Sequence, residues 1–173
     1  MPGSSLIYIS LGSNIEPEKH MRIACDELKR QLAQAVTSPV YQSPAIGMEG
    51  ADFLNAVIGG NTFLSPAGII SLLREIETAH GRVRSKNKFS DRTLDLDLLL
   101  FGELITQNDV TESGFSINLP HPEITEQAYV IQPLADIAPD VKHPIRSSTI
   151  SQLCQQMKTE SPGSFNALKK ITL

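Results

Sequence analysis

The segment from 94 to 101 reads Leu-Asp-Leu-Asp-Leu-Leu-Leu-Phe and limits the possible folds more than any other part of the sequence. Alternate side chains of a β-strand share a face. One face of this predicted strand carries leucines at 94, 96, 98 and 100. The other face begins with Asp95 and Asp97 and continues with Leu99 and Phe101. We therefore predict a strand that is buried on both sides and has two carboxylates at one end.

The carboxylates of Asp95 and Asp97 raise an electrostatic problem. Two ionised groups on one face repel each other, and desolvation at the strand end adds to the cost of keeping them charged. A bound divalent cation would remove both penalties. Magnesium suits this position, because it accepts one or two carboxylates, keeps some waters and completes its shell with substrate phosphates. The alternative is a pair of solvated aspartates at the mouth of the strand.

A basic segment directly precedes the two aspartates. A third of the 15 lysines and arginines in the chain lie between 82 and 92: Arg82, Arg84, Lys86, Lys88 and Arg92. Arginine offers a planar fork that grips two phosphate oxygens, and lysine a flexible point charge. A solvated charged loop is the plainer interpretation of this segment alone. Next to two aspartates, it favours a small anionic ligand that carries phosphate groups.

The composition argues against other functional classes. The net charge of −4 and the sequence pI of about 5.5 disfavour general nucleic-acid binding, which usually needs a basic surface. The apolar runs are too short to cross a bilayer, and the first five residues include neither a basic region nor an apolar signal stretch. We therefore expect a cytoplasmic protein, with Cys25 and Cys154 as free thiols.

Hydrophobic spacing predicts two helices before the carboxylate strand. The first opens at Glu16-Pro17, and its apolar residues recur at helical spacing: Met21, Ala24, Leu28, Leu32 and Ala35. The second has Ser65 as its cap and Pro66 in its first turn, and Gly81 ends it.

Strands are predicted at 6–11, 36–42 and 53–63, and Gly59-Gly60 indicates a bulge or a close approach of another segment. The resulting order is β-α-β-β-α-β. This order is typical of the ferredoxin-like α+β fold, an antiparallel sheet with two helices on one face.

The remainder of the chain carries weaker signals. We expect a polar surface excursion at 106–116, a short helix at 125–134, a helix at 147–157 and a loosely held end. Residues 1–173 are expected to form a single domain, with a core at about 6–144 and a C-terminal helical extension at about 145–173.

Two further side chains are candidates for a site. Glu77 follows Ile70 and Leu73 at helical spacing and so lies near the buried face, where it would bond a ligand or pair with an arginine. His121 stands between two prolines and is presented rigidly. It is either a structural residue or a fixed hydrogen-bond donor near phosphates.

Six motifs, taken in order, resemble those of the 6-hydroxymethyl-7,8-dihydropterin pyrophosphokinase family of folate biosynthesis. The similarity covers roughly residues 6–144. The motifs are Leu11-Gly12-Ser13-Asn14, Ser43-Pro44, Phe53-Leu54-Asn55, Gly81-Arg82-Val83-Arg84, Arg92-Thr93-Leu94-Asp95-Leu96-Asp97 and Pro120-His121-Pro122. The most specific element is the Arg-x-x-Asp-x-Asp sequence together with the arginine-rich loop.

The resemblance implies transfer of the terminal diphosphate of ATP to the hydroxymethyl oxygen of a reduced pterin, with release of AMP. Asp95 and Asp97 would hold two magnesium ions that bridge the phosphates. Arg82 and Arg92 would be the catalytic arginines that close on the triphosphate. Both partners would be small molecules, ATP and the pterin, and the enzyme is expected to be a monomer without nucleic-acid or membrane partners.

The resemblance also implies the two binding sites. The ATP site would comprise Glu77, Arg84, Lys86, Leu98 and His121. The pterin would lie between the rings of Phe53 and Tyr129. Its hydrogen-bonding edge would be recognised by a side-chain amide and a short loop: Asn55 and Ser43, Pro44, Ala45 and Ile46.

The sequence departs from the family pattern at several positions. Ser90-Asp91 replaces the usual Gly-Pro before the second arginine, and Phe89 stands where tryptophan is frequent. Ser116 and Gln127 align with positions that carry arginine in some members. Asp91 adds a negative charge to a loop expected to bind phosphate, and Ser116 and Gln127 predict fewer cationic contacts to ATP.

Two other functions are compatible with the predicted fold, because fold alone does not determine function. One is another two-metal enzyme on a βαββαβ scaffold, such as a nucleotidyltransferase or a cyclase, which would release pyrophosphate. The other is a non-catalytic RNA-binding module of the same topology. An aromatic content of 5%, the absence of tryptophan and the acidic pI argue against RNA binding.

Overall fold

A computed structural model describes residues 3–83 and 91–173. The strands are β1 (Ser5–Ser13), β2 (Ala33–Thr37), β3 (Val40–Ser43), β4 (Phe53–Thr62), β5 (Asp95–Phe101), β6 (Asp109–Val110), β7 (Ser116–Ile117) and β8 (Lys169–Ile171). The α-helices are α1 (Pro17–Gln31), α2 (Pro66–Ala79), α3 (Ala128–Ile137), α4 (Ile150–Glu160) and α5 (Pro162–Asn166), and η1 (Pro122–Thr125) is a 3-10 turn.

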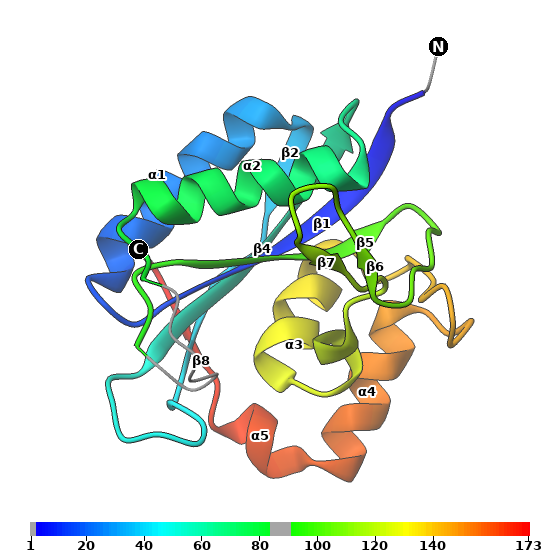
Figure 1. Ribbon diagram of the computed structural model, residues 1–173. Coiled ribbons are helices and arrows are strands. Elements are labelled where there is room, and N and C mark those ends of the chain that lie inside the picture. Colours follow the sequence, from blue (N-terminus) through cyan, green and yellow to red (C-terminus); the bar gives the residue numbers. More distant parts are fainter. Residues whose placement is uncertain (1–2, 84–90) are drawn as a thin grey trace.

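An antiparallel sheet organises these elements, with strand order β5-β1-β4-β3-β8 and β2 paired beside β3 on β4. Helices α1 and α2 lie together on one face of the sheet (Figure 1). They bury a core that includes Ile7, Leu28 and Leu73. The predicted fold class, a ferredoxin-like α+β sheet with helices packed on it, is confirmed.

The opposite face of the sheet is covered by α3 and α4 (Figure 1). A second apolar cluster joins these helices to the strands through residues that include Val57, Leu99, Leu134 and Leu153. The helix predicted at 147–157 is α4, and it begins with a capping box in which Thr149 and Gln152 bond each other's backbone amides. The sheet is therefore buried on both sides, as the leucine-rich strand predicted.

The predicted alternation along β5 is wrong after Leu99. A β-bulge lies between the pairs Ile9–Leu98 and Tyr8–Leu100, so Leu99 is an extra residue with no partner of its own. The bulge reverses the faces beyond it. Leu100 joins the cluster under α3, and Phe101 packs with the core under α1 and α2. Asp95 and Asp97 precede the bulge and keep the common face that the alternation predicted.

The first helix is shorter than predicted, and the second strand is divided. Helix α1 ends at Gln31, and Leu32 already has extended backbone angles, so Leu32 and Ala35 lie outside the helix. Strands β2 and β3 replace the single strand predicted at 36–42. Pro39 separates them, because proline has no N–H to donate to a ladder.

The last residues are paired, which corrects the prediction of a loosely held end. Strand β8 forms the edge of the sheet, with Ile171 opposite Val40 and Lys169 opposite Gln42. The polar excursion at 106–116 is mostly exposed and contains the small β6–β7 hairpin.

Gly59 confirms the close approach predicted for the glycine pair. A Cβ atom at Gly59 would lie 2.5 Å from Cε1 of Tyr8, which pairs with it across the sheet. No side chain fits at that distance. The ring of Tyr8 therefore covers β4 at a point where only glycine leaves room.

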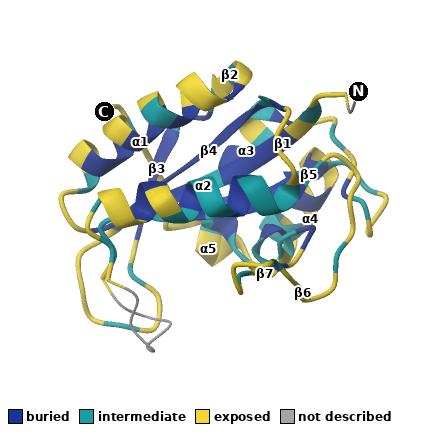
Figure 2. Ribbon diagram, turned by 45° about the horizontal axis from the view of Figure 1, so that its top comes forward, coloured by how far each residue is buried: buried dark blue, intermediate teal, exposed yellow. Residues whose placement is uncertain are grey.

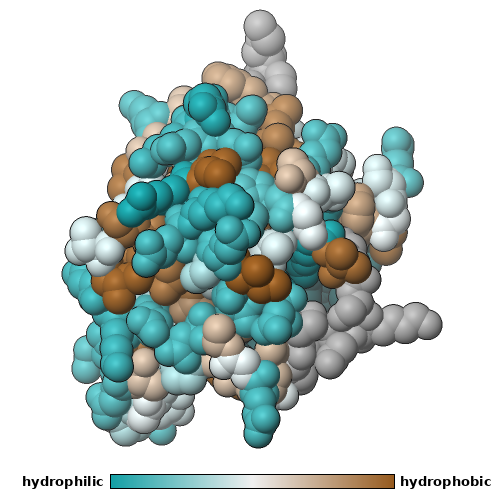
Figure 3. Space-filling view, turned by 90° about the vertical axis from the view of Figure 1, so that its left-hand side faces the viewer, coloured by the Kyte–Doolittle hydropathy of each residue, from teal (hydrophilic) through white to brown (hydrophobic). Residues whose placement is uncertain are grey.

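Burial follows the layers of the fold. The strands are mostly buried, and α1 and α2 each present a buried side to the sheet and an exposed side to solvent (Figure 2). The face shown in Figure 3 is mainly hydrophilic, with small hydrophobic patches separated by polar side chains. Within residues 3–83 and 91–173, no helix is both long enough and apolar enough to cross a membrane.

A histidine pair joins α1 to the end of α2. The Nδ1 atoms of His20 and His80 lie 2.7 Å apart, and both imidazoles are almost buried. Such a hydrogen bond needs a proton on one Nδ1 and a lone pair on the other, so the pair does not tolerate protonation of both rings. Burial, and next the charge of His80, lower the pKa of His20, while the carboxylate of Glu16 opposes this effect.

The stability of the protein should therefore fall when the pH drops below about 6.5. The unfolded chain protonates His20 near its ordinary pKa of 6.5, whereas the folded chain keeps His20 neutral to a lower pH. The stability that neutral His20 contributes is therefore complete above pH 6.5 and is lost as the pH falls. Urea unfolding at pH 7.5 and 5.5 should show a smaller pH dependence for His20→Gln than for the unchanged protein. Equal pH dependence in the two proteins would contradict this role.

Candidate active site

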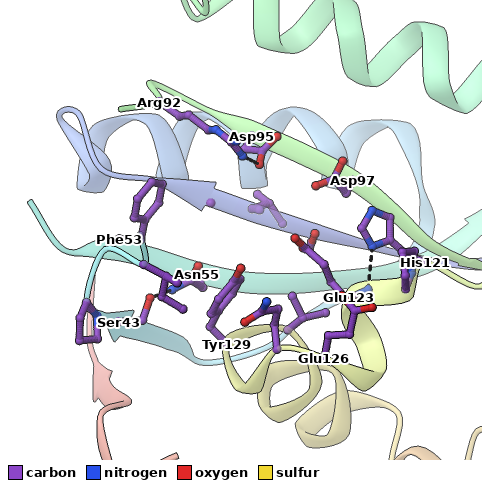
Figure 4. Close-up of a pocket in the computed structure, with 18 of the residues that line it drawn as sticks. Ser43, Phe53, Asn55, Arg92, Asp95, Asp97, His121, Glu123, Glu126 and Tyr129 are labelled. Atoms are coloured by element: carbon purple, nitrogen blue, oxygen red, sulfur yellow. Dashed lines mark hydrogen bonds and ion pairs between the residues drawn. The ribbon is translucent and has the colours of Figure 1, made fainter. Parts of the chain in front are cut away.

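A cavity of about 560 Å³ opens between the start of β5 and α3 (Figure 4). This volume lies in the usual range for small-molecule sites, roughly 300–1,000 Å³. Residues from β1, β3, β4, α2, β5, η1 and α3 and from the segments beside them line it: Ser10, Leu11, Gly12, Ser43, Pro44, Ile46, Phe53, Asn55, Arg74, Arg82, Arg92, Asp95, Asp97, His121, Pro122, Glu123, Glu126, Gln127, Tyr129 and Val130.

Two arginines neutralise Asp95. Nη1 of Arg82 donates to Oδ1 of Asp95 at 2.7 Å, and Nη1 of Arg92 donates to Oδ2. All three side chains are mostly buried, with exposed fractions between 15% and 23%. The ends of the basic segment are therefore fixed on the first carboxylate of β5.

Glu77 organises the back of the cavity. Glu77 is 1% exposed, and its Oε1 accepts the backbone N–H of Leu96 at 2.8 Å, on the outer edge of β5. It also accepts from Nη1 of Arg74 at 2.6 Å and from Nη1 of Arg82 at 2.5 Å. The sequence left open whether Glu77 bonds a ligand or pairs with an arginine, and the structure shows the pairing with arginine.

Asp97 is held in a less favourable environment than Asp95. Nη2 of Arg74 lies 3.7 Å from its Oδ1, farther than the arginines lie from Asp95. Burial, and next the charge of Asp95, raise the pKa of Asp97 to about 7. Asp97 also lies close to His121 and Glu123, so that one possible ligand atom from each falls within 4.8 Å of the others. This corner of the cavity favours a cation.

His121 faces this corner as a neutral hydrogen-bond donor. Its Nδ1 accepts the backbone N–H of Glu123 at 3.3 Å, so the proton of the neutral ring lies on Nε2 (Figure 4). Burial lowers the pKa of His121, which favours this neutral form. The backbone N–H of His121 donates to the carbonyl of Leu99, the bulge residue, and this bond fixes the ring beside β5.

The other end of the cavity carries two aromatic rings and an amide. Phe53 and Asn55 extend from β4, and Tyr129 extends from α3 (Figure 4). Nδ2 of Asn55 donates to Oγ of Ser43 at 2.8 Å and to the carbonyl of Tyr41 at 3.2 Å. Both amide hydrogens are thus occupied, and Oδ1 is the group that Asn55 can offer to a ligand.

Comparison with known proteins identifies the family. Residues 8–139 match the family described as 7,8-dihydro-6-hydroxymethylpterin-pyrophosphokinase (HPPK). The chain belongs to the HPPK family. The resemblance inferred from the motifs is thereby confirmed, and so is the predicted class of enzyme, a pyrophosphokinase.

Curated relatives agree with this assignment. The chain is 37% identical to the 2-amino-4-hydroxy-6-hydroxymethyldihydropteridine pyrophosphokinase of Pseudomonas aeruginosa, over 80% of this chain and 83% of that protein. It is 35% identical to the protein of the same name from Bacillus subtilis, over 86% of this chain and 87% of that protein.

Solved structures support the fold. Wild-type HPPK-DHPS of Plasmodium falciparum matches 99% of this chain with a TM-score of 0.74 and 14% identity. The match covers 45% of that longer chain, so this chain spans about half the length of the solved protein. At this identity the likeness concerns the fold alone.

Most of the HPPK residues predicted from the motifs meet in the cavity, but several do not line it. Glu77 lies behind the arginines, and Leu98 is buried in the core under α1 and α2. Ala45 is not on the lining, although its neighbours Pro44 and Ile46 are. Arg84 and Lys86 fall outside the described residues, as do Phe89 and Ser90.

Sequence reasoning missed three charged residues of the lining: Arg74, Glu123 and Glu126. Arg74 could have been found, because it stands three residues before Glu77 and so shares its helix face. Glu123 follows the Pro-His-Pro turn directly. Of the two positions where arginine was expected in some relatives, Gln127 lines the cavity and Ser116 does not.

Replacing the charge of Asp97 should stabilise the protein at alkaline pH. The unfolded chain loses this proton near pH 3.8 and the folded chain near 7, so the stability contributed by protonated Asp97 is lost as the pH rises through about 7. We expect Asp97→Asn to be more stable at pH 8 by roughly 1–3 kcal/mol in urea unfolding. Asp109→Asn, at an exposed position, is the control. An unchanged or lower stability of Asp97→Asn would exclude this charge effect.

Proposed function

We propose that the protein transfers the terminal diphosphate of ATP to the hydroxymethyl oxygen of 6-hydroxymethyl-7,8-dihydropterin and releases AMP. One observation carries the proposal beyond family membership. A single cavity joins the carboxylate pair of Asp95 and Asp97, with its arginines, to an end formed by Phe53, Asn55 and Tyr129. A phosphate donor and a flat heteroaromatic acceptor need such a combination.

Asp95 and Asp97 fit the two magnesium ions that the family implies. Both carboxylates line the cavity on one face of β5, and their mutual repulsion helps to raise the pKa of Asp97. A divalent ion would relieve that repulsion, and carboxylate oxygens are the ligands that magnesium prefers. When bound, such ions neutralise developing charge on the phosphates and orient the displacement.

Arg82 and Arg92 are proposed to bind the triphosphate. Their guanidinium groups already lie at the cavity, held on Asp95 and Glu77. Arginine forks match phosphate oxygens as well as they match carboxylates. These side chains would therefore stabilise charge on the transferred group with little reorganisation, which is the main contribution that proteins make to phosphoryl transfer.

His121 is proposed to donate its Nε2 hydrogen to a phosphate oxygen. The bond from the backbone of Glu123 to Nδ1 fixes the tautomer that such a donor requires. Because burial lowers its pKa, the ring would contribute a hydrogen bond without a full positive charge. The nearby Glu123 would otherwise favour protonation.

Phe53, Asn55 and Tyr129 are proposed to hold the pterin. Aromatic rings stack on a flat heteroaromatic ring, and burial raises the pKa of Tyr129, so its side chain stays an uncharged phenol. Oδ1 of Asn55 would accept from an N–H donor on the edge of the pterin. Ser43, which fixes the amide of Asn55, would set the orientation of that acceptor.

The reaction product separates this proposal from a nucleotidyltransferase on the same scaffold. Diphosphate transfer leaves AMP, whereas nucleotidyl transfer leaves pyrophosphate. The cytoplasmic location, the monomeric state and the absence of nucleic-acid partners stay predictions from the sequence.

Incubation with ATP, magnesium and hydroxymethyldihydropterin tests the reaction directly. We expect one AMP for each pterin diphosphate formed, measured by chromatography of the nucleotides and the pterins. Asp97→Ala should reduce the rate by at least about a thousand-fold, because the proposed magnesium site would lose half of its carboxylates. Release of pyrophosphate, or a normal rate in Asp97→Ala, would refute the assigned reaction.

Removal of the Phe53 ring should weaken pterin binding. Loss of stacking and of buried apolar area predicts about a ten-fold higher Kd for Phe53→Ala, measured by calorimetry with the reduced pterin. Phe63→Ala is the matched control, because Phe63 is 77% exposed and does not line the cavity. An unchanged Kd in Phe53→Ala would remove this ring from the pterin site.

A further inference from the structure

Asn14 connects two separate segments that border the cavity. It follows β1 directly and is 5% exposed. Its Oδ1 accepts the backbone N–H of Arg92 at 2.7 Å. Its Nδ2 donates to Oδ1 of Asp91 at 2.7 Å and to the carbonyl of Ala51 at 3.3 Å. One primary amide thus uses its acceptor and both of its donors on residues far apart in the sequence.

The two connected segments carry opposite ends of the proposed site. Ala51 ends the loop that begins with Pro44 and leads into Phe53, at the aromatic end of the cavity. Asp91 precedes Arg92, whose guanidinium bonds Asp95 at the phosphate end. Asn14 is therefore placed to couple the positions of these two ends.

The backbone supports the same connection. The N–H groups of Asn14 and Ile15 both donate to the carbonyl of Arg92, at 3.0 and 3.3 Å. Oγ of Ser13 donates to the carbonyl of Thr93 at 2.6 Å. Residues 13–15 consequently hold both sides of Arg92, and the side chain of Asp91 adds a charge-assisted bond to this set.

Asp91 is used differently from what its charge suggested. On sequence grounds, Asp91 adds a negative charge to a loop expected to bind phosphate. In the structure Asp91 does not line the cavity, and its Oδ1 is directed to the amide of Asn14. Asp91 also lies close to the loop 44–52, because a Cβ atom at Gly50 would lie 3.1 Å from its Oδ1.

We propose that Asn14 and Asp91 are positioning residues that lock the loop ending at Ala51 to the segment of Arg92 and thereby hold Arg92 on Asp95. The lock itself is a property of the fold. Its effect on catalysis rests on the proposed function.

Hydrogen exchange tests the lock without any substrate. In Asp91→Ala, the amide hydrogen of Arg92 should exchange at least about ten-fold faster. The reason is that Asn14, which accepts this hydrogen, loses its hydrogen bond to the charged carboxylate of Asp91. Peptides covering 44–52 should also exchange faster. Asp91→Asn keeps an oxygen that accepts from Asn14, so its exchange should stay within about three-fold of the unchanged protein. Glu49→Ala, an exposed charge removal in the same loop, is the control.

Steady-state kinetics test the consequence. Asp91→Ala should lower kcat about ten-fold with less than three-fold change in the KM for ATP, and Asp91→Asn should restore kcat. Unchanged exchange in Asp91→Ala would overturn the lock. Faster exchange with unchanged kcat would overturn the positioning role. An unchanged protein that makes no AMP would refute the proposed function instead, and the exchange result would still decide the lock.

Discussion

The burial of three carboxylates beside one strand edge is the constraint on which the site depends. Asp95, Asp97 and Glu77 gather at the start of β5, and arginines neutralise Asp95 and Glu77. Glu77 also satisfies the backbone N–H of Leu96, which the sheet leaves without a neighbouring strand. Removing one partner of such a buried pair typically costs about 3–5 kcal/mol, because the other charge is left uncompensated. The geometry of the cavity and the stability of this sheet edge are therefore linked.

Much of the fold could be predicted because local patterns carry it. The cap at Ser65 is confirmed by its bond to the amide of Gly68, and Gly81 adopts the positive φ that ends α2. The reversal after Leu99 could not be predicted, because an extra residue in a run of leucines changes no hydrophobic pattern. The pairing of β8 with β3 was also hidden. It joins residues more than a hundred positions apart, and the sequence of β8 is short and polar.

The candidate site likewise contains some residues that could be predicted from the sequence and others that could not. Asp95 and Asp97 could be predicted because they share a strand face near a basic segment. Phe53 and Tyr129 are brought together from β4 and α3 by the two-sided packing of the sheet, and only the family resemblance indicated them. Glu123 was not found, since an acidic residue after a turn has no distinctive spacing. Glu123 lies at the cavity because it follows His121, whose backbone N–H donates to the carbonyl of the bulge residue Leu99.

The charges of the cavity explain how one set of arginines can serve both stability and the proposed chemistry. In the structure Arg82 and Arg92 compensate Asp95. In the proposed reaction the same guanidinium groups would also contact phosphate oxygens, and Asp95 and Asp97 would hold the divalent ions that the family implies. Positive charge would then face both the carboxylates and the phosphates inside the cavity, which limits the cost of burying either. In the structure Arg74 binds Glu77, whose carboxylate accepts the backbone N–H of Leu96 at the sheet edge.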